Sequence, residues 1–156
     1  ESTTKGGNTV FKHILVPTDG SELSQQTARH AIAFAKSIGA RITFFSARPP
    51  YHADYSGEGT LVDFRSPEEF DAATETKAKS ILDEICKLAT EAGVQSKAVS
   101  DVSDVPYRAI IDAAESYACD MIFMASHGRK GLSSIIMGSQ SNKVLTNSTI
   151  PVLVYR

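Results

Sequence analysis

The sequence is poor in features that define several large protein classes. Its only cysteines are Cys86 and Cys119, with no C-x-x-C pair and no histidines beside them. Neither a disulfide framework nor a cysteine-ligated zinc site is therefore expected. No apolar run approaches the roughly 20 residues that a membrane-spanning helix needs. Buried or half-buried free thiols suit a reducing compartment, so we expect a cytoplasmic protein that does not bind membranes.

An excess of charge of either sign is also missing. Lys and Arg number 16 against 18 Asp and Glu, which leaves a net charge of −2. This balance gives no electrostatic reason to expect binding to nucleic acid or to an anionic membrane surface. The four histidines are scattered along the chain, a pattern that does not suggest a metal cluster.

Two well-known nucleotide motifs are absent. The sequence has no G-x4-G-K-[S/T] loop, so a P-loop enzyme is not expected. No G-x-G-x-x-G follows the first apolar segment, which argues against a dinucleotide-binding fold of that type.

The first residues differ from the rest of the chain. The segment ESTTKGGNT at residues 1–9 is polar and lacks the apolar core of a signal peptide. We expect residues 1–10 to form a disordered tail. Residues 11–156 then fit a single domain of ordinary size.

Five short segments of this domain predict β-strands: four are largely apolar, and one, residues 95–102, alternates in part and has small polar residues typical of a strand near an edge. They are His13–Pro17, Arg41–Ala47, Gln95–Val102, Asp120–Ala125 and Pro151–Tyr155. Between them lie segments of helical periodicity. Strict alternation of strand and helix predicts an α/β protein with a doubly wound, five-stranded parallel sheet and helices on both faces.

Helix boundaries are signalled by capping residues. Ser21 and Ser66 can cap the first two helices, and Gly39 and Gly93 are placed to end them. A third helix starts near Pro106, and the fourth runs from Ser139 to about Asn147. Residues 48–65 show no periodicity, which is typical of a functional or mobile loop.

Two segments rich in ligand-type residues follow predicted strands. Pro17–Ser21 (PTDGS) follows the first strand, and the segment from Ala125 to Ser139 follows the fourth. Ligands in doubly wound sheets bind outside the carboxyl ends of the strands, where the winding reverses. If the first and fourth strands are neighbours at that point, both segments face one crevice.

The second of these segments has the chemistry of an anion site. Gly128 and Gly138 permit backbone angles closed to other residues and let amides approach a ligand. Ser139 offers a hydroxyl and an amide at a helix start, where the dipole favours a phosphate. Arg129 and Lys130 add positive charge. The alternative is that Gly138 and Ser139 form only a tight turn and an N-cap.

Asp19, in the first segment, has two possible roles. Its carboxylate suits a ribose hydroxyl or a divalent cation, or it accepts N–H bonds within a turn. Pro17 fixes the exit of the strand and removes a donor. His127 could act as an acid or base. The sequence supplies neither an orienting partner nor a nucleophile, and we predict no catalytic residue.

These segments resemble the motifs of the universal stress protein A-like family. Val16–Ser21 (VPTDGS) looks like the V-P-x-D-G-S opening of that family. The pattern from Ala125 through Gly128 to Gly138 and Ser139 looks like its G-x2-G-x9-G-[S/T] nucleotide loop, and PVLVY looks like its P-V-L-V-V end. The resemblance implies an adenine nucleotide alpha hydrolase-like fold with strand order 3-2-1-4-5.

Function and ligand are also implied by this resemblance. It implies a stress-response protein that acts as a regulatory homodimer and binds ATP, ADP or AMP, together with Mg²⁺. Asp19 would hold the ribose and could contact the metal, and Pro17 would flank the adenosine. Ala47 would lie near the adenine, and Met124 and Ala125 would line the base and sugar.

The phosphates are assigned to the glycine loop in the same way. Gly128, Gly138 and Ser139 would hold them, and Gln140 would supply a further amide. The full set of expected binding residues is Pro17, Thr18, Asp19, Ala47, Met124, Ala125, His127, Gly128, Arg129, Gly138, Ser139 and Gln140.

One position departs from the family pattern, since Ala125 stands where the first glycine of the loop is expected. Its methyl group narrows the approach to the ligand if the position requires a glycine-only conformation, and costs little if the backbone is ordinary. Two alternatives stay open: a dimeric interaction module that binds no nucleotide, and a slow ATP hydrolase acting through His127 and Asp19.

The last strand predicts self-association. Pro151–Tyr155 is short and apolar, and an uncovered edge of this kind is a liability in a soluble sheet. The family resemblance implies that two copies pair this strand antiparallel across a two-fold axis.

Overall fold

The computed structural model describes residues 10–52, 66–128 and 137–156. Most of the expected tail, and residues 53–65 of the expected loop, lie outside the described residues. The strands are β1 (His13–Pro17), β2 (Arg41–Arg48), β3 (Ser96–Val102), β4 (Met121–Ala125) and β5 (Val152–Tyr155). The helices are α1 (Glu22–Ile38), α2 (Pro67–Glu91), α3 (Pro106–Ser116) and α4 (Ser139–Asn147).

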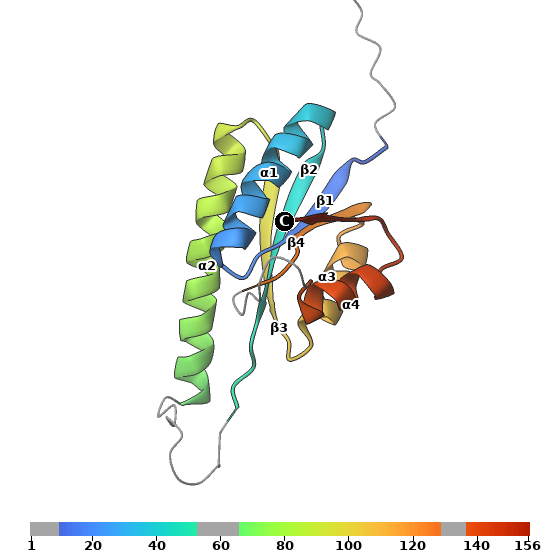
Figure 1. Ribbon diagram of the computed structural model, residues 1–156. Helices are drawn as coiled ribbons and strands as arrows, with labels where there is room; N and C mark the ends of the chain where they lie inside the picture. Colours follow the sequence, from blue (N-terminus) through green and yellow to red (C-terminus); the bar gives the residue numbers. More distant parts are fainter. Residues whose placement is uncertain (1–9, 53–65, 129–136) are drawn as a thin grey trace, which may run out of the picture.

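The strands form one parallel sheet in the order β3-β2-β1-β4-β5 (Figure 1). This confirms the predicted fold class and strand order. β1 lies at the centre, between β2 and β4, and the winding of the chain reverses between β1 and β4. The carboxyl ends of these two strands are therefore neighbours, as a site at the reversal point requires.

Helices cover both faces of the sheet (Figure 1). α1 and α2 pack on one face, over a core that includes Ile14 and Phe44. α3 and α4 pack on the other face, over a core that includes Leu15 and Phe45. Successive strand residues point to opposite faces, and here both faces are buried, which explains why the central strands are mostly apolar.

The predicted capping signals operate at the first two helices. Ser21 accepts a hydrogen bond from the Ser24 amide (3.2 Å) at the start of α1, and Gly39 ends that helix with φ of 71°. At α2, the Glu69 amide donates to the Ser66 hydroxyl (3.1 Å), and the Ser66 amide donates to the Glu69 carboxylate (2.9 Å). This capping box is stabilising because it satisfies two otherwise open donors.

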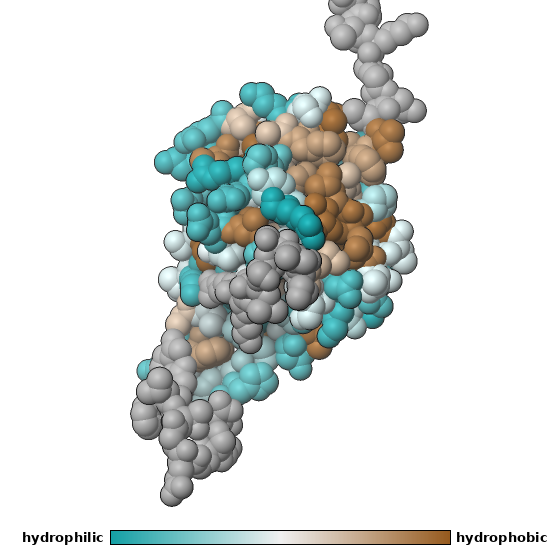
Figure 2. Space-filling model, in the orientation of Figure 1, coloured by the Kyte–Doolittle hydropathy of each residue, from teal (hydrophilic) through white to brown (hydrophobic). Residues whose placement is uncertain are grey.

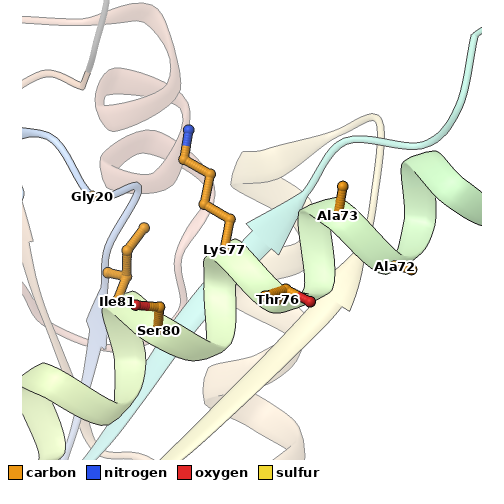
Figure 3. Close-up of a pocket in the computed structure, with 7 residues that line it drawn as sticks. All are labelled: Gly20, Ala72, Ala73, Thr76, Lys77, Ser80 and Ile81. Carbon is orange, nitrogen blue, oxygen red and sulfur yellow. The ribbon is translucent and has the colours of Figure 1, made fainter. Parts of the chain in front are cut away.

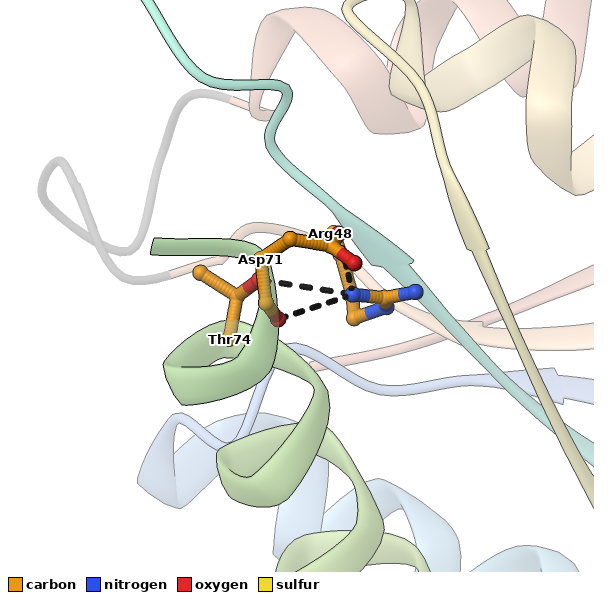
Figure 4. Close-up of polar contacts among 3 residues, drawn as sticks. All are labelled: Arg48, Asp71 and Thr74. Atoms are coloured by element: carbon orange, nitrogen blue, oxygen red, sulfur yellow. Dashed lines mark hydrogen bonds and ion pairs between the residues drawn. The ribbon is translucent and has the colours of Figure 1, made fainter. Parts of the chain in front are cut away.

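Arg48, which the sequence places in a loop, is the last residue of β2. It pairs with Val102 of β3. Its guanidinium donates to the Asp71 carboxylate (3.0 Å) and contacts the Thr74 hydroxyl (3.4 Å), so it ties β2 to the first turns of α2 (Figure 4). This arginine side chain is 11% exposed. The prediction ended the strand one residue early because the backbone pairing that extends it comes from β3, about 50 residues away in the sequence.

Both cysteines are free thiols; Cys119 is buried and Cys86 is half-buried, as predicted. Burial raises the pKa of the Cys119 thiol to about 11, so this thiol stays protonated and unreactive at neutral pH. Within residues 10–52, 66–128 and 137–156, no helix has the length and apolar character needed to cross a membrane.

His13 is a buried polar residue at the amino end of β1. Its Nε2 shares a hydrogen bond of 2.7 Å with the Thr43 hydroxyl. Burial lowers the pKa of His13 below its usual 6.5, and the positive charges of Arg41 and Lys97 lower it further. The folded protein therefore binds a proton at this ring less readily than the unfolded chain.

This difference predicts acid sensitivity that begins near neutrality. Below about pH 6.5 the unfolded chain binds more protons at His13, so the free energy of unfolding falls by up to about 1.4 kcal/mol per pH unit. Urea denaturation between pH 7.5 and 5.5 should show this loss in the wild type and a shallower dependence in His13→Gln. The other histidines are common to both proteins, and identical pH dependences would exclude His13 as the cause.

Candidate functional site

A cavity of about 700 Å³ lies at the carboxyl edge of the sheet, between the ends of β1 and β4 and the first turns of α3 and α4. Its volume lies within the range of about 300–1,000 Å³ that is usual for small-molecule sites. It also occupies the point where the winding reverses, which is where doubly wound sheets bind ligands.

Eleven of the twelve expected binding residues line this cavity. They are Pro17, Thr18, Asp19, Ala47, Met124, Ala125, His127, Gly128, Gly138, Ser139 and Gln140. The twelfth, Arg129, lies outside the described residues. The structure thus brings together segments that are more than 100 positions apart in the sequence.

Seven further lining residues were missed by sequence reasoning. They are Ser24, Phe45, Pro106, Ile110, Met137, Ser141 and Asn142. Two of them, Ser141 and Asn142, continue the first turn of α4, and extending the glycine motif by two residues would have found them. The α3 residues carry no motif, because only the folded chain places that helix beside α4.

The turn after β1 is held by a backbone bond to β2 and by hydrogen bonds of its own side chains. The Thr18 amide donates to the Phe45 carbonyl (2.8 Å), and the Thr18 and Ser24 hydroxyls share a hydrogen bond of 3.1 Å. Asp19 Oδ1 accepts from the Ser21 amide (2.9 Å), which is the turn role that its residue type predicts. The Asp19 carboxylate is thereby fixed in place where it faces Gly128.

The two described ends of the glycine loop are tied together by hydrogen bonds. The Gly138 amide donates to the Ser126 carbonyl (2.9 Å), and the Ser141 hydroxyl donates to the Ala125 carbonyl (3.0 Å). These bonds hold the start of α4 against the end of β4. The position of this helix start therefore follows from the sheet itself.

α4 begins with an open set of donors. Gly138 at its N-cap makes no side-chain hydrogen bond, and the Asn142 amide is bonded to the Gly138 carbonyl (2.9 Å). The amides of Ser139, Gln140 and Ser141 have no acceptor within the described part of the chain. Three N–H groups at the positive end of a helix dipole form an environment suited to an anion.

The structural reason for the loop glycines differs from the one expected. Gly138 has φ of −58°, and the described glycines with positive φ are Gly20, Gly39 and Gly93. The expectation of special backbone angles at Gly128 and Gly138 is therefore wrong. What these positions require is space, because a Cβ would meet other atoms at both.

The two glycines meet different obstacles. A Cβ built on Gly138 would lie 3.2 Å from His127 Cα, and one built on Gly128 would overlap the Asp19 carboxylate. Each glycine thus allows a close approach between two segments that line the cavity. Gly138 allows the loop ends to meet, and Gly128 allows the loop to meet the turn after β1.

Ala125 has an ordinary strand backbone. It is the last residue of β4, pairs with Tyr155 of β5, and does not have positive φ. No glycine-only conformation is required at this position. An alanine at this position therefore introduces no backbone strain. The departure from the family glycine at position 125 is thus compatible with the fold of the loop.

His127 makes one described side-chain hydrogen bond, between its Nδ1 and the hydroxyl of the adjacent Ser126 (3.1 Å). Within the described ranges no carboxylate is bonded to its ring. A histidine that acts as a base is normally oriented by such a partner. The described geometry therefore gives His127 a place in the wall of the cavity and no support for an acid–base role.

A second hollow, of about 890 Å³, lies between α2 and the turn at Gly20 (Figure 3). One face of α2 lines it with mostly small side chains, and Lys77 extends from that face. It is larger than the first cavity, but it lacks the convergence of polar groups that fixes a ligand. We therefore assign the candidate site to the cavity at the ends of β1 and β4.

The chain is similar to proteins of one known family. Residues 11–156 match the model of the Universal stress protein family. A universal stress protein of Methanocaldococcus jannaschii is 32% identical over 155 residues, which cover 99% of this chain and 88% of the relative.

Two solved structures share the fold. A universal stress protein in complex with cAMP matches with a TM-score of 0.68 and 22% identity, over 94% of this chain and 97% of its own. A universal stress protein from Archaeoglobus fulgidus in complex with dAMP matches with a TM-score of 0.63 and 17% identity, over 95% of this chain and 99% of its own.

The contact between Gly128 and Asp19 can be tested by a double-mutant cycle. Gly128→Ala should lower the free energy of unfolding by about 0.5–1.5 kcal/mol, because the new methyl group must displace the Asp19 carboxylate from its hydrogen bond with the Ser21 amide. In an Asp19→Ala background the same change should cost less than half as much, as measured by urea denaturation.

Gly138→Ala is the matched control for this cycle. Its Cβ meets the backbone of His127, so its cost should be the same with and without Asp19→Ala. Equal costs of Gly128→Ala in the two backgrounds would show that the carboxylate does not occupy this space.

Proposed function

The chain belongs to the universal stress protein family, and we propose that it binds an adenine nucleotide (AMP, ADP or ATP) in the cavity at the ends of β1 and β4. The observation that carries the proposal is that one cavity joins an apolar end to the open amides of α4. A nucleotide has the same division, with a flat apolar base at one end and phosphates at the other.

The apolar end suits a purine base. Ala47, Ile110 and Met124 line it, from three different elements of the fold. These side chains offer no charged group, so they favour stacking and dispersion contacts over ionic ones. Asp19 lines the same cavity, and its carboxylate can accept hydrogen bonds from ribose hydroxyls.

The donor-rich end suits phosphate. The amides of Ser139, Gln140 and Ser141 converge there, and the Ser139 hydroxyl adds a further donor. Two proteins of the same fold are in complex with cAMP and dAMP, which both carry an adenine and a phosphate group. Mg²⁺ would enter with a di- or triphosphate, with Asp19 as its candidate carboxylate ligand.

We propose binding rather than hydrolysis as the activity. His127 is bonded to Ser126, and the described part of the site supplies no acid–base pair. A nucleotide held without turnover is suited to regulation, in which occupancy changes the stability or the surface of the protein.

Self-association through β5 is the second part of the proposal. β3, the other edge of the sheet, carries the charged residues Lys97 and Asp101, which discourage pairing between chains. β5 is Val-Leu-Val-Tyr and half-buried, and Figure 2 shows apolar side chains gathered over it. An edge of this composition favours pairing with a second copy of the chain.

The hydrogen bonds between β4 and β5 indicate which backbone groups of β5 are left to pair with a second copy. The Ile122 amide donates to the Pro151 carbonyl (2.9 Å), and the Ser126 amide donates to the Tyr155 carbonyl (2.8 Å). Polar groups of alternate strand residues point to opposite sides. The amides and carbonyls of Val152 and Val154 therefore face the open edge.

Nucleotide binding can be tested by calorimetry and thermal unfolding with AMP, ADP and Mg-ATP. At 100 times the dissociation constant, ligand should raise the melting temperature by roughly 5–10 °C. Gly138→Val should abolish the effect, because a branched side chain would block the approach of the amides. Thr146→Val, on the exposed face of α4, should bind as the wild type does.

The absence of any thermal shift in the wild type, together with no nucleotide released on denaturing the purified protein, would contradict the proposal. It would favour an interaction module that binds no nucleotide.

The dimer can be tested by hydrogen exchange at single-residue resolution. The amides of Val152 and Val154 should be protected at high protein concentration and exchange faster on dilution, since the proposed strand pairing would cover them. Leu153 and Tyr155 serve as internal controls, because their amides point toward β4 at any concentration. Light scattering that shows only monomer at micromolar concentration would contradict the dimer.

A further inference from the structure

α3 begins without a cap of its own. Val105 occupies the N-cap position and makes no side-chain hydrogen bond, and Pro106 has no amide hydrogen. The next amide, that of Tyr107, donates to Gln140 Oε1 at 3.0 Å. Gln140 belongs to the first turn of α4, 33 residues away along the chain. One helix thus caps the other.

This bond fixes the orientation of the Gln140 carboxamide. A backbone N–H can only donate, so the atom that faces Tyr107 must be the carboxamide oxygen. The NH₂ group is then left with both of its hydrogens. Among the described residues no acceptor is bonded to Nε2, and Gln140 is a half-buried residue of the cavity wall.

The Gln140 side chain also lies at the phosphate end of the cavity. Side chains on a helix tilt toward the N-terminus of that helix. Gln140 stands in the first turn of α4, so its carboxamide is directed to the same end as the open amides of Ser139 and Ser141. Its NH₂ group adds a side-chain donor to this backbone set.

From these observations we infer that the Gln140 carboxamide is a phosphate-recognition group. Its Nε2 donates to a phosphate oxygen of the nucleotide while its Oε1 caps α3. The inference rests on the proposed function and names a side chain that, with the open amides of α4, distinguishes a nucleotide from a nucleoside. Because α3 supplies Pro106 and Ile110 to the cavity, the same side chain also holds the wall near the base in place.

Two substitutions separate the phosphate contact of Gln140 from its capping of α3. Gln140→Glu keeps an oxygen for the Tyr107 amide but cannot donate and adds a negative charge. Gln140→Met has similar length and offers neither an acceptor nor a donor, and it adds no charge. Binding of AMP and of adenosine is measured by calorimetry for the wild type and both variants, and their melting temperatures are measured without ligand.

Both variants should lose at least about tenfold in affinity for AMP, which is the weight of one hydrogen bond to a charged group. Adenosine should bind Gln140→Glu and the wild type alike. Without ligand, Gln140→Met should melt about 2–4 °C lower because α3 loses its cap. Gln140→Glu should have the same melting temperature as the wild type.

Failure of this inference can be distinguished from failure of the proposed function. Wild-type affinity for AMP in Gln140→Met would overturn the inference, since any loss in Gln140→Glu would then be charge repulsion alone. Equal losses of affinity for AMP and for adenosine in Gln140→Glu would overturn it too, because the carboxamide would then not be contacting the phosphate. In both cases nucleotide binding itself would stand. A wild type that binds neither ligand would overturn the proposed function and this inference together.

Discussion

The parallel pairing of β1 with β4 is the constraint on which the rest of the site depends. Ile14 lies opposite Met121 and Leu15 lies opposite Ile122, so the two strands end side by side where the winding of the chain reverses. The turn after β1 and the loop after β4 are thereby placed against each other. Neither segment alone forms a cavity. The cavity forms because the paired strands β1 and β4 place the two segments against each other.

Close packing between these two segments, and between the two ends of the loop after β4, explains the small residues in the motif. Gly128 leaves room for the Asp19 carboxylate, and Gly138 leaves room for the backbone of His127. The bond from the Gly138 amide to the Ser126 carbonyl then fixes where α4 begins. The Ser141 hydroxyl adds a second bond, to the Ala125 carbonyl, so the sheet positions the first turn of α4 and its open amides.

Sequence reasoning succeeded where the signal was local or repeated. Apolar runs and, for β3, partial alternation predict the five strands to within about one residue, and the cap roles of Ser21 and Ser66 are confirmed. It was less successful where a residue acts through a distant partner. Arg48 extends β2 because its backbone pairs with Val102 of β3, and its side chain is bonded to Asp71 and Thr74 on α2. No pattern near Arg48 indicates these partners.

What the sequence determined by itself is the order of the elements, the class of the sheet and the segments that carry ligand chemistry, because these follow from periodicity, capping and glycine spacing. Only the tertiary structure decided why the loop needs its glycines, whether Ala125 obstructs, and that Gln140 caps α3. Those answers depend on interatomic distances between segments far apart in the chain, and such distances exist only once the sheet has formed.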